Sequence, residues 1–230
     1  MTDSESSALR GIVESWPPTD PAGADAGAGV DIGVRGLRVR PGSHICALYT
    51  GSAERDSVLL PFLRSALLSL DKLICVLDSD DPVDVLDAIG GGVDARGCAA
   101  SRQLDLLRAR DTYLRSGRFR SVDMVGFWKA AIAGVMNTAA YPCVRAIGEM
   151  SWSLSDLPAV GEVVDFELEL NRLLPLYPQV IVCMYDLARF GTTHLVDTIK
   201  MHPYVLLGGL LVENPYFLSA QEMVAAARSW

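Results

Sequence analysis

The chain has 230 residues, of which 50% are hydrophobic and 21% are charged, and its formal net charge is −8. This composition predicts one substantial domain with a well-filled core. Direct binding of nucleic acid is not expected, because it needs clustered lysine and arginine and the sequence has no basic block. The apolar stretches are too short to span a bilayer, and the N-terminal residues lack the character of a signal peptide. We therefore expect a cytoplasmic protein.

Residues 1–40 differ from the rest of the chain. Residues 17–33 are rich in proline, glycine, alanine and aspartate without hydrophobic periodicity, which predicts a flexible tail. Residues 7–16 place four apolar side chains on one helical face: Leu9, Ile12, Val13 and Trp16. This pattern favours a short helix packed on the domain or on a neighbouring chain, and a partner-docking peptide is the alternative. The folded domain is expected to occupy residues 41–230.

Within this domain, short apolar runs alternate with helix-like segments. Such runs are typical of strands that are buried on both faces, and they occupy residues 44–49, 73–78, 103–107, 143–148, 180–185 and 204–208. Apolar spacing predicts helices over residues 53–70, 82–89, 121–138, 159–174, 192–200 and 219–229. Pro61 is expected to kink or restart the first of these helices. The alternation predicts an α/β fold, in which a mostly parallel sheet carries helices on both faces.

The junction "HICALYTGSAERDS" (residues 44–57) is where such a fold would carry a phosphate-binding loop. A P-loop needs a glycine-rich turn that ends in lysine followed by serine or threonine. The three lysines, Lys72, Lys129 and Lys200, all lack this context. Glu54 and Asp56 instead bring negative charge to the predicted helix start, where it would repel a triphosphate. ATP hydrolysis by the P-loop mechanism is therefore not expected.

The carboxyl ends of the predicted strands carry aromatic and polar side chains. Ligands of open α/β sheets bind beyond these ends, so we expect a small-molecule pocket there, with no metal in it. Its predicted lining consists of Tyr49, Glu149, Ser151, Trp152, Tyr185, Asp186 and Arg189. The structural alternative is that Asp186 pairs with Arg189, that Trp152 is ordinary core, and that Glu149 caps a neighbouring helix.

His44 and Cys46 share one strand face, which is compatible with metal binding, but no other ligand has diagnostic spacing. The sequence therefore does not predict a metal site. His194 and His202 are interpreted as structural residues. "GEMSW" (residues 148–152) is not a nucleophile elbow, because it does not follow the G-x-S-x-G pattern.

Seven blocks of the chain, in order from residue 42 to 218, resemble the MEDS domain, the methanogen/methylotroph DcmR-type sensory domain. They are "GSHICALYTGSAERDSVLLPFLRSAL", "DKLICVLD", "DTYLRSGRF", "GEMSWSL", "FELELNRLLP", "VIVCMYDLARF" and "HPYVLLGGLLVENPYF". The resemblance implies a RecA/KaiC-like three-layer sandwich without working Walker motifs.

The resemblance also implies a non-catalytic sensor of small organic compounds, including hydrocarbon derivatives, in signal transduction or transcription regulation. Such domains sit beside output modules, and this sequence has no recognisable output domain. We therefore expect the signal to pass through a protein partner, such as a regulator or a kinase-type module, or through homo-oligomerisation. Two alternatives remain: a KaiC-like nucleotide-binding enzyme that uses Glu149 or Asp186, and a ligand-free partner-switching scaffold. No cofactor can be assigned.

Overall fold

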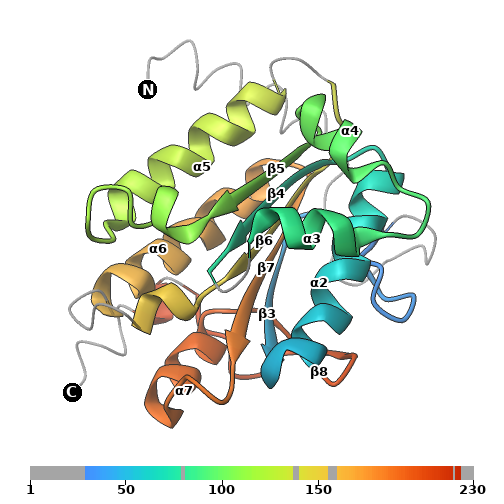
Figure 1. The fold of residues 1–230 in the computed structure, drawn as a ribbon. Helices are drawn as coiled ribbons and strands as arrows, with labels where there is room; N and C mark the ends of the chain where they lie inside the picture. Colours follow the sequence, from blue (N-terminus) through green and yellow to red (C-terminus); the bar gives the residue numbers. More distant parts are fainter. Residues whose placement is uncertain (1–28, 79–80, 137–139, 155–159, 220, 224–230) are drawn as a thin grey trace.

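The computed structural model describes residues 29–78, 81–136, 140–154, 160–219 and 221–223. Its main feature is a seven-stranded sheet with the order β5-β4-β6-β7-β3-β8-β9 (Figure 1). All neighbouring pairs are parallel except β8 and β9. The strands are β3 (Ser43–Tyr49), β4 (Lys72–Leu77), β5 (Leu104–Arg108), β6 (Val144–Glu149), β7 (Gln179–Asp186), β8 (Tyr204–Leu207) and β9 (Leu210–Glu213). The predicted α/β fold is confirmed.

Helices cover both faces of this sheet, so the core has two halves. One half lies between the sheet and α2, α3 and α4, and the other lies between the sheet and α5, α6 and α7 (Figure 1). The helices are α2 (Gly51–Leu68), α3 (Pro82–Ile89), α4 (Ala95–Ala100), α5 (Ser121–Met136), α6 (Val160–Leu173) and α7 (Thr192–Lys200). Short 3-10 turns are η1 (Ala109–Asp111), η2 (Ser151–Leu154) and η4 (Leu174–Leu176).

The central strands are buried along almost their whole length, because helices lie on both sides of them. Every residue of β3, β4 and β6 is buried. Their bounds agree with the apolar runs to within about one residue. Within the seven-stranded sheet and the α-helices that cover it, α4 and β9 were not predicted. The Gly208–Gly209 pair after β8 is a turn with φ of 58° and 79° that reverses the chain into β9.

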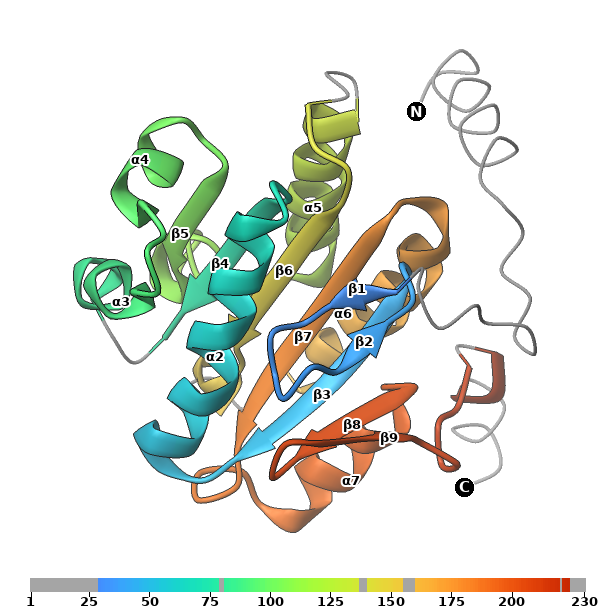
Figure 2. The ribbon, with the colours of Figure 1, turned by 90° about the vertical axis from the view of Figure 1, so that its right-hand side faces the viewer.

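The boundary that we predicted at residue 40 is too late. Residues Val30–Asp31 (β1) and Arg38–Val39 (β2) form an antiparallel hairpin that packs on the α2 face of the sheet (Figure 2). Ile32 in its turn is completely buried. Composition suggested a tail because so short a hairpin gives no alternating pattern. The expected helix 7–16 lies outside the described residues, and so does most of the helix expected at 219–229.

The expected restart at Pro61 is not found, because α2 runs through it as one helix. Phe62 and Leu63 are buried with Val58 and Leu59 before the proline, so one packed face spans the site. The loss of one backbone hydrogen bond at proline is offset by this shared burial.

Candidate functional site

The carboxyl ends of β3, β4, β6 and β7 meet at one edge of the sheet, which we call the polar edge. Tyr49 and Asp186, the last residues of β3 and β7, lie opposite each other in register. The polar edge contains five of the seven predicted site residues, together with Asp78 and Arg55: Tyr49, Glu149, Ser151, Asp186 and Arg189.

Glu149 is the centre of the polar edge. Its side chain is buried, and its Oε1 lies 3.3 Å from Nη1 of Arg55, a buried arginine of α2. Its Oε2 accepts a hydrogen bond of 2.6 Å from the backbone N–H of Asp78. Arg55 also donates to Oδ1 of Asp56 from Nε and Nη2, at 3.0 and 2.7 Å. The charges at the edge therefore satisfy one another.

Burial perturbs two other groups at the polar edge. Burial raises the pKa of Tyr49 to about 12, and the carboxylates of Glu149 and Asp186 add to this effect. Burial also raises the pKa of Asp78, although Arg189, whose Nη1 lies 3.8 Å from its Oδ2, lowers it in part. The structural alternative, in which the side chains of Asp186 and Arg189 pair with each other, is not found among the described residues, because Arg189 pairs with Asp78. Asp186 accepts a hydrogen bond from the backbone of Ala188.

The N-terminus of α2, where a phosphate loop would lie, is closed by a side chain of the helix itself. Oε2 of Glu54 accepts a hydrogen bond of 2.7 Å from the backbone N–H of Thr50. A carboxylate thus interacts with the positive end of the helix dipole. The geometry agrees with the expectation, drawn from the missing lysine, that this junction does not hold a triphosphate.

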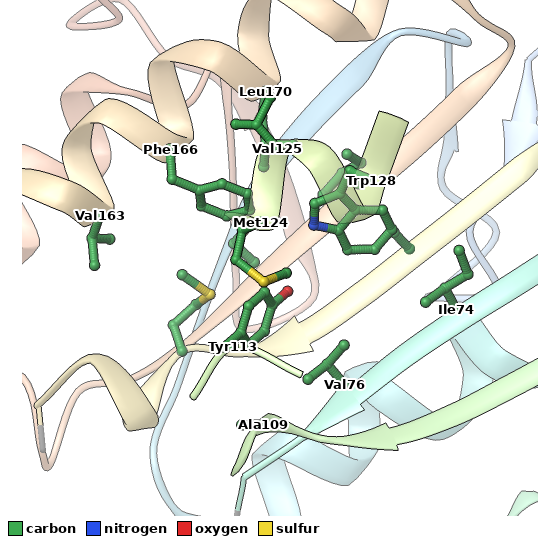
Figure 3. Packing of buried hydrophobic residues seen from close by; sticks show 14 of the residues in the cluster. Ile74, Val76, Ala109, Tyr113, Met124, Val125, Trp128, Val163, Phe166 and Leu170 are labelled. Atoms are coloured by element: carbon green, nitrogen blue, oxygen red, sulfur yellow. The ribbon is translucent and has the colours of Figure 1, made fainter. Parts of the chain in front are cut away.

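The other two predicted residues, Trp152 and Tyr185, lie on the opposite face of the sheet, beneath α5 and α6. The pocket that we predicted as one set is therefore divided between two faces. Trp152 is 1% exposed and stacks on Tyr113 at 4.7 Å and on Phe119 at 4.6 Å between ring centroids. Phe166 packs edge-on against both Tyr113 and Phe119. We call Tyr113, Phe119, Trp152 and Phe166 the aromatic cluster (Figure 3 shows the rings of Tyr113 and Phe166).

The aromatic cluster contains unsatisfied polar atoms. Among the described residues, Nε1 of Trp152 and Nε1 of Trp128 are buried without a hydrogen-bond partner. Trp128 lies close enough to the Tyr113 hydroxyl to influence its pKa, but not in hydrogen-bonding geometry. A cavity of about 10 Å³ is lined by Tyr113, Trp128 and Phe166, next to Gly148 of β6. The missing side chain at Gly148 leaves space there, since a Cβ would lie 3.5 Å from the Tyr113 hydroxyl.

Tyr185 contacts a second buried group of side chains on the same face of the sheet. Its hydroxyl donates to Oε1 of Glu167 at 2.9 Å. Glu167 lies among His44, Cys183 and His202, and all four side chains are buried. Burial lowers the pKa of His202 to about 4. Burial opposes ionisation of Glu167, yet the neighbouring His202 and His44 hold the pKa of its carboxyl below the usual value.

Sequence reasoning missed three members of this second feature. His44 and Cys46 do share a face of β3, but the thiol beside His44 belongs to Cys183 on β7. The available signal was Glu167, which stands among the inward residues of α6. The apolar residues that share the inward face of α6 and the turn after it are all buried: Val163, Phe166, Leu170, Leu173 and Leu174.

A groove of about 660 Å³ lies at the opposite, amino ends of the strands. Its lining includes Arg64, Asp71 and Arg145. The charges of Asp71 and Arg145 are paired at 2.6 Å, and Arg145 also donates to the backbone of the β1–β2 hairpin. This groove was not predicted, because it is formed largely by the hairpin that we had placed in the tail.

The structure is thus an α/β domain with charged groups paired at its strand ends and a buried aromatic cluster on one face of its sheet. Residues 43–203 match the model of the family described as MEDS, the methanogen/methylotroph DcmR sensory domain. The chain therefore belongs to the MEDS family.

Comparison with individual proteins agrees with this family. The transcriptional repressor DcmR of Methylorubrum extorquens is 28% identical over 177 residues, which cover 74% of this chain and 61% of the repressor. The chain thus matches about three fifths of that relative's length. The crystal structure of the uncharacterized protein PH0321 from Pyrococcus horikoshii, solved with an unknown peptide, is 13% identical. It covers 74% of this chain and 78% of that chain with a TM-score of 0.57, a likeness of fold alone. None of the helices in the described part of the chain is long and apolar enough to span a membrane.

Proposed function

We propose that this chain is a non-catalytic sensory module that binds a small organic compound and transmits its presence to transcription regulation through a protein partner. The MEDS family is described as a sensory domain, and the relative DcmR is a transcriptional repressor. Together they support a role in sensing and regulation. The ligand, its site and the route of the signal are the parts that we add.

The observation that carries the ligand site is the buried indole N–H of Trp152, which has no partner among the described residues. A buried donor without a partner costs about 1–3 kcal/mol. A ligand with one hydrogen-bond acceptor would recover this free energy. Because Tyr113, Phe119 and Phe166 surround the indole, the rest of the ligand is expected to be apolar.

Binding at this place requires the aromatic cluster to move. The cavity of about 10 Å³ beside Tyr113 and Phe166 has room for about one water molecule. A ligand of several heavy atoms must therefore displace a ring, and Phe119 is suited to this because α5 begins two residues later. The N–H of Ser121, the first residue of α5, donates to Glu162 of α6 at 2.7 Å. Displacement of Phe119 would thus reach both helices, and the ligand would favour the displaced state by its differential affinity.

A role of the polar edge in ligand binding remains a prediction. Its groups Tyr49, Glu149, Ser151, Asp186 and Arg189 are near one another, but their charges are largely engaged within the edge. The same engagement supports the absence of nucleotide chemistry, because Glu54 and Glu149 would face the phosphates. The RecA/KaiC-like assignment is likewise retained as a proposal.

The proposed function is tested by thermal shift with one- to four-carbon alcohols, ketones and haloalkanes, and with Mg·ATP as the competing class. We expect at least one organic compound, and not the nucleotide, to stabilise the protein saturably. Trp152→Phe keeps an aromatic ring but removes the N–H, so it should weaken that binding about tenfold, the effect of one hydrogen bond of about 1.4 kcal/mol. Tyr49→Phe is the matched control at the polar edge and should bind normally.

Three outcomes would contradict the proposal in different ways. Loss of binding in Tyr49→Phe but not in Trp152→Phe would move the ligand to the polar edge. Saturable stabilisation by Mg·ATP, with turnover that survives repurification, would favour the nucleotide-binding alternative. No stabilisation by any compound would favour a ligand-free scaffold.

A further inference from the structure

Four side chains from four segments converge in the core between the sheet and α6. They are His44 of β3, Glu167 of α6, Cys183 of β7 and His202, which follows α7. One possible ligand atom from each lies within 4.8 Å of the others, and all four residues are buried. We call this set the His-Glu-Cys-His cluster. A group of ionisable side chains this deep in a core needs a compensating interaction.

The distances within the cluster fit a tetrahedral metal site. Metal bonds of about 2.0–2.3 Å at tetrahedral angles separate the ligand atoms by about 3.3–3.7 Å. Nε2 of His44 lies 3.2 Å from Oε2 of Glu167 and 3.4 Å from Sγ of Cys183. Oε2 of Glu167 lies 3.7 Å from Nε2 of His202 and 3.9 Å from Sγ of Cys183. Four of the six distances thus lie close to those of a coordination tetrahedron, and the other two are at most 4.8 Å.

Outer hydrogen bonds aim both imidazoles inward. The side-chain amide of Asn171 donates to the carbonyl of Met201 at 2.7 Å, which turns its Oδ1 toward Nδ1 of His44 at 3.0 Å. Nδ1 of His202 lies 2.7 Å from the carbonyl of Thr198. Both Nδ1 atoms therefore face acceptors, so each imidazole in its neutral form carries its proton on Nδ1 and turns the lone pair of Nε2 toward the centre.

This arrangement leaves acceptors facing acceptors. The lone pairs of both Nε2 atoms point at the Glu167 carboxylate, and Nε2 of His202 has no hydrogen-bond partner among the described residues. Tyr185 donates only to the other oxygen, Oε1. A cation at the centre would satisfy all of these groups. Outer-shell donors and acceptors of this kind are also what holds metal-ligating histidines and carboxylates in place.

We propose that His44, Glu167, Cys183 and His202 bind one Zn²⁺ ion as a structural site. Two imidazoles, one thiolate and one carboxylate are zinc donors, and four protein ligands leave no position for a substrate. The thiolate and the carboxylate balance the two positive charges, so a buried site would be neutral. The ion would join α6 and the residues after α7 to the central strands β3 and β7. This proposal does not depend on the proposed ligand site.

The test starts with zinc content, measured by inductively coupled plasma mass spectrometry on the full chain. We expect one zinc per chain, and a lower thermal midpoint after refolding in chelator. Refolding with Co²⁺ should give intense visible bands of tetrahedral cobalt and a near-ultraviolet thiolate-to-cobalt band. Cys183→Ser should lose the thiolate band, whereas Cys75→Ser, which removes a buried thiol on β4 outside the cluster, should keep it.

Several results would overturn the proposal. One is a folded wild-type chain with no zinc and no cobalt bands, whose midpoint does not respond to chelator; the cluster would then be a proton-bridged His44–Glu167 pair. Another is an unchanged thiolate band in Cys183→Ser. If Cys183→Ser does not fold, His202→Gln serves as the second variant, and an unaltered cobalt spectrum in it would equally contradict the site.

Discussion

Arg55 of α2 and Glu149 of β6 form a buried ion pair, with 3.3 Å between Nη1 and Oε1, at the edge where the central strands end. The pair links the first helix of the sheet domain to a strand two positions away from β3 in the sheet. It occupies the region in which an α/β fold of this kind otherwise receives a ligand. The polar edge is therefore held together by its own charges.

Replacing either partner of this ion pair should destabilise the protein, but the cost should differ between the two partners. Arg55→Ala leaves the Glu149 carboxylate buried without its arginine and is expected to cost about 3 kcal/mol. Glu149→Gln should cost less, because Asp56 still accepts from Arg55. Denaturant unfolding of the two single variants and the double variant measures this. Costs that simply add, with no coupling, would contradict the pair as a stabilising contact.

Trp152 should behave as a core residue in its effect on stability. It is 1% exposed and stacked on two rings, so Trp152→Ala is expected to cost about 3–5 kcal/mol of unfolding free energy. Trp152→Phe should cost clearly less. Equilibrium denaturation checks both values. A cost near 1 kcal/mol for the alanine variant would place Trp152 at a solvent-filled crevice instead.

The β1–β2 hairpin should contribute to the stability of the protein because it packs on the domain, whereas a flexible tail would not contribute. Gly33 has φ of +75°, and a Cβ there would lie 2.1 Å from the Pro61 carbonyl oxygen of α2. Gly36 has φ of +71° with nothing within 4 Å of its Cβ position, so it is the matched control. Both alanine variants bear the cost of left-handed backbone, about 1 kcal/mol. Gly33→Ala should lower the melting temperature further, and equal melting temperatures would mean that the hairpin is not docked.

Stability should fall at alkaline pH partly through Tyr49. Its folded-state pKa of about 12 lies above its ordinary value of 10, mainly because of burial and then of Glu149 and Asp186. The neutral phenol is thus favoured in the folded state. The contribution of this neutral phenol to the free energy of unfolding is fully present below pH 10 and is lost as the pH rises through the folded-state pKa of Tyr49.

The comparison that isolates this effect is the pH dependence of the unfolding free energy in wild type and in Tyr49→Phe. The variant should show a shallower loss between pH 10 and about 12, since a difference of one in pKa corresponds to about 1.4 kcal/mol. Parallel pH profiles would contradict the perturbed pKa of Tyr49.

The fold was predictable from sequence wherever a segment carries its own pattern. The strands β3, β4 and β7 are apolar runs, and α3 and α7 have the predicted bounds because spacing and terminal residues agree. The β1–β2 hairpin was not predictable, since its burial depends on α2 and on Arg145, far away in the sequence. Pro61 predicts a break when the sequence is considered alone, because the sequence does not show that the residues on both sides of it pack into the same core.

The polar edge was predictable from the sequence, but the face of the sheet on which each residue lies was not. Strand ends identify Tyr49, Glu149 and Asp186 because parallel strands end together at one edge. Alternation within a strand does not reveal where the chain turns after it, and η2 places Trp152 on the opposite face from Glu149. The His-Glu-Cys-His cluster brings together four segments spread over about 160 residues, so no local spacing in the sequence predicts it.

The most direct test of the proposed sensor is the ¹⁵N–¹H NMR spectrum of the tryptophan indoles during titration with the stabilising compound. The chain has four tryptophans, so the spectrum has at most four indole signals, and the signal that Trp152→Phe removes is that of Trp152. We expect the Trp152 indole signal to shift saturably, with the same midpoint as the thermal-shift titration, because its N–H gains a hydrogen bond. Saturable binding that leaves the Trp152 signal unmoved would contradict the aromatic cluster as the ligand site.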